Sequence, residues 1–200
     1  MKTLTESAFL AWADSAGLCL DPRYPHSAVL TFRPDPKQDR FWEVPAEPEV
    51  RPYFILSFLE LMGDWQECYA WRHLGSWPES VDPSHINEIV ERQILGGLGL
   101  PLGTADVVGF ERAELDKLVT LMFSTTVFGW SVAEDIYVVP DHARCILQTD
   151  HHNVIHVSCR SSGDVDEWVR QMADRGFVLP EEVPDSTFKQ PDWMKGEGQS

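Results

Sequence analysis

Hydrophobic residues recur every three to four positions near the start of the chain, which is the spacing of one buried helix face. The segment begins at Thr3 and Glu6, a pair typical of a capping box, and Gly17 is expected to end it. Its apolar positions are Phe9, Trp12, Ala13 and Ala16. The pattern predicts an N-terminal helix.

Four later segments also carry helical signals. They run from Tyr53 to Met62 after Pro52, from Asp82 to Gly96, from Glu111 to Phe123, and from Asp164 to Gly176. The first of them is apolar on nearly every side and fits a central helix or a buried strand, but its strong helix formers favour a helix. Asp164 and Glu167 make a second capping box before apolar residues at helical spacing.

Shorter runs with β-type composition predict strands. Ala28–Phe32 and Phe41–Val44 flank a turn-rich loop, so a hairpin is expected there, and Cys68–Arg72 is expected to be a strand. Three consecutive strands follow near the C-terminus, at Val132–Val139, Arg144–Thr149 and Val154–Cys159. The connections PDHA and DHHN are rich in turn formers.

This order of elements predicts an α+β fold: an antiparallel sheet of hairpins and a C-terminal three-strand meander, packed with several amphipathic helices. Residues 1–180 are expected to form one domain, and residues 181–200 an acidic, proline-interrupted tail. Two small lobes meeting near the glycine-rich residues 96–109 are the alternative.

The chain has 32 acidic and 16 basic residues, for a formal net charge of −16. This charge disfavours nucleic acids and anionic membrane surfaces, which attract basic proteins. It favours solubility and a basic protein partner. The simpler interpretation is an ordinary acidic surface without a charged partner.

The first residues lack the long apolar core of a signal peptide, and the run from Tyr53 to Met62 is too short to span a bilayer. The four cysteines form no C-x-x-C pair. We therefore expect a cytoplasmic protein with reduced, mostly buried thiols.

The segment from His142 to Arg160 contains two cysteines and four histidines. If Asp150–Asn153 forms the turn, Thr149 lies opposite Val154, Leu147 opposite His156, and Cys145 opposite Ser158. In this register Cys159 points toward the core, His156 points away from it, and Cys145 lies near His156.

These ligand types are divided between two faces and a turn, whereas a zinc site needs four converging ligands. We therefore expect no metal and no cofactor. A nucleophilic Cys145–His156 pair is a further hypothesis, but the acidic surroundings would raise a thiol's pKa, so an inert thiol is favoured.

Other motifs are weaker. The glycine-rich Gly96–Gly103 lacks the lysine of a phosphate-binding loop and is expected to be a connector. Acids at Glu134, Asp135, Asp141 and Asp150 could pair, but solvated strand ends explain them as well.

Aromatic residues cluster on and after the predicted strand Cys68–Arg72. Tyr69, Trp71, Arg72 and Trp77 are of the types enriched in protein-interface hot spots, although tryptophan and tyrosine also fill cores.

Three functions remain open from the sequence. The first is an acidic protein-binding module, in its most concrete form an immunity-type inhibitor of a basic toxin. Its contact surface would be the strand Tyr69–Trp77 or the turn at Asp141, His142, Asp150, His151, His152 and Asn153. The second is a small-substrate enzyme that uses the histidine and aspartate residues of 141–156. The third is a structural or assembly accessory protein; the sequence leaves the oligomeric state open.

Overall fold

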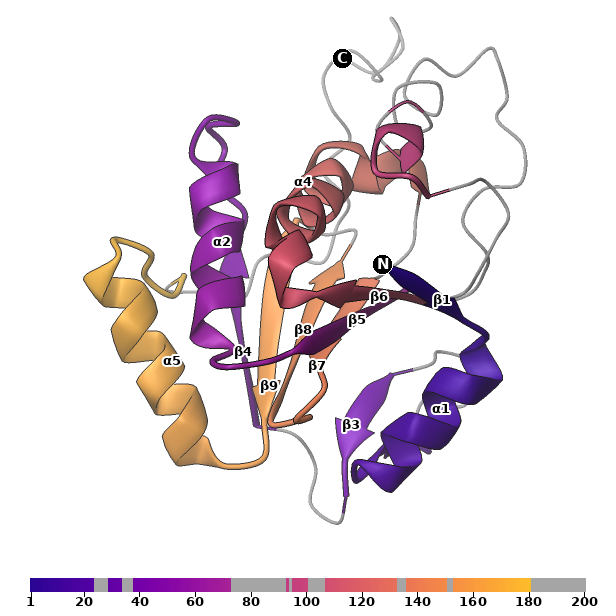
Figure 1. The fold of residues 1–200 in the computed structure, drawn as a ribbon. Helices are drawn as coiled ribbons and strands as arrows, with labels where there is room; N and C mark the ends of the chain where they lie inside the picture. Colours follow the sequence, from indigo (N-terminus) through magenta and orange to yellow (C-terminus); the bar gives the residue numbers. More distant parts are fainter. Residues whose placement is uncertain are drawn as a thin grey trace, which may run out of the picture.

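The computed structural model describes residues 1–23, 29–33, 38–72, 93, 95–100, 107–132, 136–150 and 153–180. Within these residues seven antiparallel strands form one sheet in the order β1-β6-β5-β7-β8-β9-β4 (Figure 1). They are β1 (Lys2–Leu4), β4 (Gln38–Glu43), β5 (Glu67–Arg72), β6 (Val107–Glu111), β7 (Ile136–Pro140), β8 (Cys145–Asp150) and β9 (Val154–Cys159). A separate hairpin pairs β2 (Leu18–Leu20) with β3 (Leu30–Phe32).

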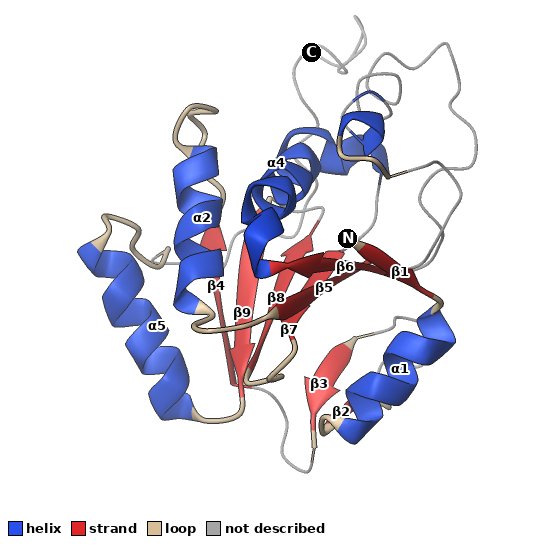
Figure 2. Cartoon of the chain, in the orientation of Figure 1, coloured by secondary structure: helices blue, strands red, loops and turns tan. Residues whose placement is uncertain are grey.

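Helices cover one face of the sheet, and a helix with the small hairpin packs on the other (Figure 2). The first layer consists of α2 (Arg51–Leu61), α4 (Leu115–Val132) and α5 (Ser162–Asp174); a short 3-10 turn, η1 (Arg112–Glu114), precedes α4. The second layer consists of α1 (Glu6–Ser15) with β2 and β3. The predicted α+β class is confirmed, including the C-terminal meander β7-β8-β9.

Burial on both faces explains why the central strands are apolar almost throughout. Leu147, Ile155 and Val157 pack under the three-helix layer, while Tyr137 and Ile146 pack toward α1. All five residues of β7 are buried. Such strands read as continuous apolar runs rather than as alternating patterns.

The described helices lie close to their predicted positions, with corrections at their ends. The helix predicted to begin at Glu111 begins only after that residue, which ends β6, as the 3-10 turn η1 followed by α4. The side chain of Thr5, not that of Thr3, accepts the capping hydrogen bond from the backbone N–H of Ala8, because Thr3 belongs to β1. Helix α4 continues to Val132, beyond the predicted end at Phe123. The strand predicted to begin at Val132 therefore begins at Ile136.

The predicted hairpin between Ala28–Phe32 and Phe41–Val44 is wrong. Strand β3 pairs with β2, and β4 pairs with β9 at the edge of the large sheet. The three residues of β2 directly follow α1 and were too few to stand out in the sequence, so the nearest visible run was taken as the partner of β3.

The predicted β8–β9 register is off by one residue. Asp150 lies opposite Val154, Gln148 opposite His156, and Cys145 opposite Cys159. Asn153 adopts a left-handed backbone conformation, with φ 62°. It thus belongs to a connection of three residues between the paired Asp150 and Val154, a length typical of hairpins with one left-handed residue.

Some predictions fall outside the described residues. These are the helix start at Asp82, the acids Glu134 and Asp135, and the tail 181–200. The expected single domain over 1–180 stays a prediction. Among the described helices, none has the length and apolarity needed to cross a membrane.

Candidate functional site

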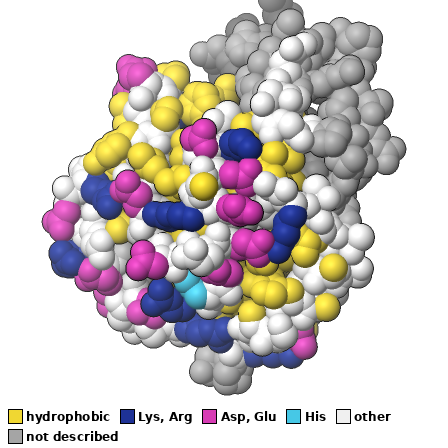
Figure 3. Space-filling model, viewed as in Figure 1, with side chains coloured by type: hydrophobic (Ala, Val, Ile, Leu, Met, Phe, Trp, Pro, Cys, Tyr) yellow, Lys and Arg dark blue, Asp and Glu magenta, His cyan; other side chains and the backbone are white. Residues whose placement is uncertain are grey.

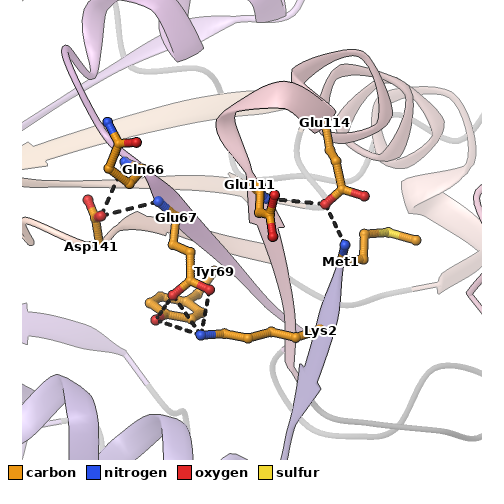
Figure 4. Close-up of polar contacts among 8 residues, drawn as sticks. All are labelled: Met1, Lys2, Gln66, Glu67, Tyr69, Glu111, Glu114 and Asp141. Atoms are coloured by element: carbon orange, nitrogen blue, oxygen red, sulfur yellow. Dashed lines mark hydrogen bonds and ion pairs between the residues drawn. The ribbon is translucent and has the colours of Figure 1, made fainter.

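A polar cluster lies where β1, β5 and β6 meet, with Glu67 at its centre (Figure 4). The Lys2 ammonium lies 2.5 Å from one Glu67 carboxylate oxygen and donates to the other at 2.6 Å. The Tyr69 hydroxyl donates to the same carboxylate at 2.7 Å. The Lys2 ammonium also lies 5.2 Å from the centre of the Tyr69 ring.

Gly109 makes this arrangement possible. In the sheet it stands between Lys2 of β1 and Tyr69 of β5. A Cβ at this position would lie 2.9 Å from Lys2 Cγ and 3.5 Å from Tyr69 Cδ1. The missing side chain leaves room for the Lys2 stem to cross β6 and reach Glu67.

Hydrogen bonding shifts the pKa values of these three groups. The Lys2 ammonium lowers the pKa of Glu67, and Glu67 in turn raises the pKa of Lys2. Burial, followed by the hydrogen bond to Glu67, raises the pKa of the Tyr69 phenol. Lys2 and Glu67 are thus held as an ion pair at neutral pH, with Tyr69 protonated beside them.

Asp141 joins this cluster from the end of β7. Its Oδ2 accepts hydrogen bonds from the backbone N–H groups of Gln66 and Glu67, each at 3.1 Å (Figure 4). The predicted site residues Asp141 and Tyr69 are therefore brought to two sides of Glu67. Asp141 caps the start of β5 and so has a structural partner.

Glu114 forms the second half of the cluster. It accepts from the Met1 amino group, from Lys117 at 2.9 Å and from the backbone N–H of Glu111 at 3.2 Å. The hydrogen bond from the amino group, followed by that from Lys117, lowers the pKa of Glu114 to about 2. On the face of the molecule drawn in Figure 3, acidic side chains form a column near the middle.

His142 is held by two backbone groups. Its Nε2 lies 3.0 Å from the Met62 carbonyl oxygen, and its Nδ1 accepts from the backbone N–H of Arg144 at 3.2 Å. These contacts fit a neutral ring that carries its proton on Nε2. His142 therefore ties the end of α2 to the β7–β8 turn.

The candidates of 141–156 that the structure describes do not lie together in one place. Asp141 and His142 precede β8, whereas Asp150 and Asn153 lie at its far end. Six residues of strand separate the two groups by roughly 17 Å. Asn153 is exposed; His151 and His152 lie outside the described residues.

The structure describes two side chains of the predicted aromatic surface, Tyr69 and Trp71, and both belong to the core. Trp71 is fully buried and Tyr69 is 6 % exposed; both pack with Phe9 of α1. The interpretation of these two residues as core fillers is therefore the correct one. Arg72 ends β5, and Trp77 lies outside the described residues.

The corrected register separates Cys145 from His156, which face opposite sides of the sheet. His156 lies beside Phe41 of β4, with ring centres 5.8 Å apart, so the prediction that it points away from the main core is confirmed. Cys159 points into that core, as predicted, and Cys145 lies opposite it. The hypothetical Cys145–His156 nucleophile is not assembled.

A pocket of about 250 Å³ reaches the two thiols, between the end of α2 and the start of α5. Cys145, Cys159 and Trp168 contribute to its wall, and Arg144, Asp164 and Glu167 bring charge. Sequence reasoning missed this pocket because it placed Cys145 on the wrong face. A correct hairpin register would have revealed the facing cysteines.

The thiols in this region are poor nucleophiles at neutral pH. Burial raises the pKa of Cys159 to about 12, with a smaller contribution from Asp164. Burial also raises the pKa of Cys145, and the neighbouring Cys159 raises it further. Both residues are thus protonated and not activated at neutral pH, so their reactions with electrophiles are slow.

An exposed apolar surface lies where the start of α2 meets the chain after α5. Tyr53 is 52 % exposed and Val178 73 %. Phe177 joins them, with its ring centre 5.7 Å from that of Tyr53 and 4.9 Å from that of Phe54. We call Tyr53, Phe177 and Val178 the α2–α5 surface; Figure 3 shows hydrophobic side chains over the upper part of α2.

Within the part of the chain that the structure describes, no three histidine, cysteine or acidic side chains are placed to hold a metal ion. Comparison with known proteins gives no relative from which a function could be carried over: no family model, no curated protein and no solved structure matches.

Proposed function

We propose that this protein is an acidic protein-binding module, of the kind that inhibits a basic toxin, and that it binds through the α2–α5 surface. The observation that supports it most is the exposure of Tyr53 and Val178, with Phe177 in contact with Tyr53 and next to Val178 in the chain. An exposed aromatic with an apolar neighbour is typical of the centre of a protein interface.

The charge around this surface favours a basic partner. Glu47 and Glu49 are exposed in the connector that enters α2, a few residues before Tyr53. The whole chain carries a net charge of −16, which would attract a basic protein from a distance and speed its association. The apolar residues would then slow its release.

The geometry gives less support to the enzyme hypothesis. Both nitrogens of His142 contact backbone groups, and Asp141 accepts two backbone N–H groups. Of the other candidates that the structure describes, Asp150 and Asn153 lie at the other end of β8 and His156 faces the opposite side of the sheet from Cys145. A general acid or base needs a free atom within reach of a substrate, and both ring nitrogens of His142 are already engaged by backbone groups.

The test is co-purification of the tagged full chain from its native host at low and at high salt. We expect one basic protein in near-equal amount at low salt, lost as salt rises. Tyr53→Ala should remove it at both salts, whereas Leu20→Ala, a change at a 40 % exposed apolar residue on β2, should retain it.

A matched pair of charge variants locates the electrostatic contribution. Glu47→Gln with Glu49→Gln should slow association more than Asp64→Asn with Asp166→Asn, which removes the same charge from exposed positions elsewhere. Equal slowing by both pairs would show general attraction only. Absence of any partner at low salt, with a self-associated species instead, would favour the assembly-protein hypothesis.

A further inference from the structure

We propose that Cys145 and Cys159 form a thiol pair that small-molecule disulfides convert into a cross-strand disulfide inside the pocket. The inference is independent of the proposed partner. In the β8–β9 ladder the two cysteines lie directly opposite each other.

The ladder gives the pair suitable spacing. Residues directly opposite in an antiparallel pair have Cα atoms about 4.5 to 5.5 Å apart, and a disulfide spans Cα separations of about 4.4 to 6.8 Å. Both side chains point to the same face, because both belong to the core under the helices. The bond thus requires side-chain rotation but no change of register.

The pocket supplies the access that a buried pair would otherwise lack. Cys145 is 4 % exposed and Cys159 1 %, yet both contribute to the pocket wall. Arg144 stands at the same opening and carries the positive charge nearest to Cys145 in this pocket, while Asp164 and Glu167 carry negative charge. The pocket therefore gives a small oxidant a route toward these two residues that does not require the sheet to unfold.

A third cysteine tests the specificity of the pairing. Cys68 is buried in the same core, where burial, followed by the charge of Cys145, raises the pKa of its thiol. However, it lies on β5, and β7 separates β5 from β8. β5 and β8 are thus two strand spacings apart, about 10 Å, which is too far for a disulfide. Of Cys68 and Cys159, only Cys159 is therefore close enough to form a disulfide with Cys145.

The chemistry balances with oxidised glutathione as the oxidant. One cysteine loses its proton, its sulfur attacks the glutathione disulfide, and one glutathione thiolate leaves. The second cysteine thiolate then attacks the mixed disulfide, and the second glutathione leaves. The protein loses two protons and two electrons, and glutathione disulfide takes them up to become two thiols. Because both thiols are protonated at neutral pH, the reaction is slow and accelerates as pH rises.

The experiment incubates the folded full chain with oxidised glutathione at several pH values, quenches with acid, and maps the linked peptides by mass spectrometry. We expect a loss of the mass of two hydrogens and a peptide pair that joins Cys145 to Cys159. The rate should increase about tenfold per pH unit below the thiol pKa values.

Variants separate the alternatives. Cys68→Ser should leave the cross-link intact, and so should Cys19→Ser on the other side of the sheet. Cys145→Ser and Cys159→Ser should each abolish it, and wild-type mapping decides the matter if either variant fails to fold. A protein that stays fully reduced, a link to Cys68, or modification confined to Cys19 would each overturn the proposal.

Discussion

The Arg160 guanidinium reaches across the molecule to the end of α1, where Nη2 donates to the Ala16 carbonyl oxygen at 2.8 Å. The same group donates to the Gly17 and Arg33 carbonyl oxygens and lies 4.8 Å from the Phe32 ring centre. One side chain after β9 thus fastens both α1 and the β2–β3 hairpin to the large sheet.

Arg160→Ala should therefore destabilise the protein by about 1 to 2 kcal/mol, since it removes charged hydrogen bonds that solvent partly screens. Urea unfolding measures the change. Arg170→Ala is the matched control: among the described residues its exposed guanidinium pairs within α5, with Glu167 and Asp174, so its loss should cost clearly less than the loss of Arg160. Equal effects of the two changes would contradict the fastening role.

Gly17→Ala should destabilise the protein by about 1 kcal/mol or more. Gly17 has φ 77°, which disfavours any side chain, and a Cβ would lie 2.9 Å from Arg160 Nη2. Gly163→Ala in the first turn of α5 is the control, because its φ is not positive and its nearest atom is 4.0 Å away. Thermal unfolding of the two variants should differ in sign or clearly in size.

Phe58→Ala should cost about 3 to 5 kcal/mol, the usual cost of emptying a buried aromatic site. Phe58 is fully buried and links two layers: its ring centre lies 5.3 Å from that of Trp42 on β4 and 5.9 Å from that of Trp168 on α5. Tyr53→Ala, on the exposed face of the same helix, should cost less than about 1 kcal/mol. A small loss for Phe58→Ala in urea unfolding would mean that the layers do not rely on this contact.

Acid should weaken the ion pair between Lys2 on β1 and Glu67 on β5. Its pKa lies below the ordinary 4.5 in the folded protein, chiefly because of the Lys2 hydrogen bond. The carboxylate therefore adds stability above pH 4.5, and this contribution is lost as pH falls through the lower folded-state pKa.

Glu67→Gln should flatten the dependence of unfolding free energy on pH in this acidic window, as measured by urea unfolding at pH values from neutral down to strongly acid. Glu49→Gln, an exposed change in the connector, should leave the dependence unaltered. An unchanged profile in Glu67→Gln would show that the Lys2 contact has no energetic role.

The sequence predicts elements best where neighbouring residues alone decide them. Helix α5 contains Val165, Trp168 and Met172 on its buried face, at the spacing that a helix demands, and β9 runs from Val154 to Cys159 as predicted. The partner of each strand was harder to predict. Phe41 of β4 pairs with His156 of β9, far along the chain, and nothing in the sequence near Phe41 indicates that partner.

The predicted surroundings of Cys145 depended on how β8 and β9 pair, and a shift of one residue in that pairing changed them. The left-handed Asn153 shortens the β8–β9 connection relative to the predicted four-residue turn, and Cys145 thereby moves from the face of His156 to that of Cys159. The α2–α5 surface was equally hidden, because the apolar run Tyr53–Met62 does not indicate that its first residue, a large hydrophobic one, is exposed.

The order of strands in the sheet also sets a schedule for folding during synthesis. Strand β4 is made early, but its partner β9 is the last strand of the sheet to be made, after β5, β6, β7 and β8. Until then the row of backbone groups that β4 offers to β9 has no strand to bind. A ribosome that stalls before Cys159 would therefore hold a chain with an unpaired strand and an uncovered tryptophan, Trp42, and such a chain is a natural substrate for chaperones.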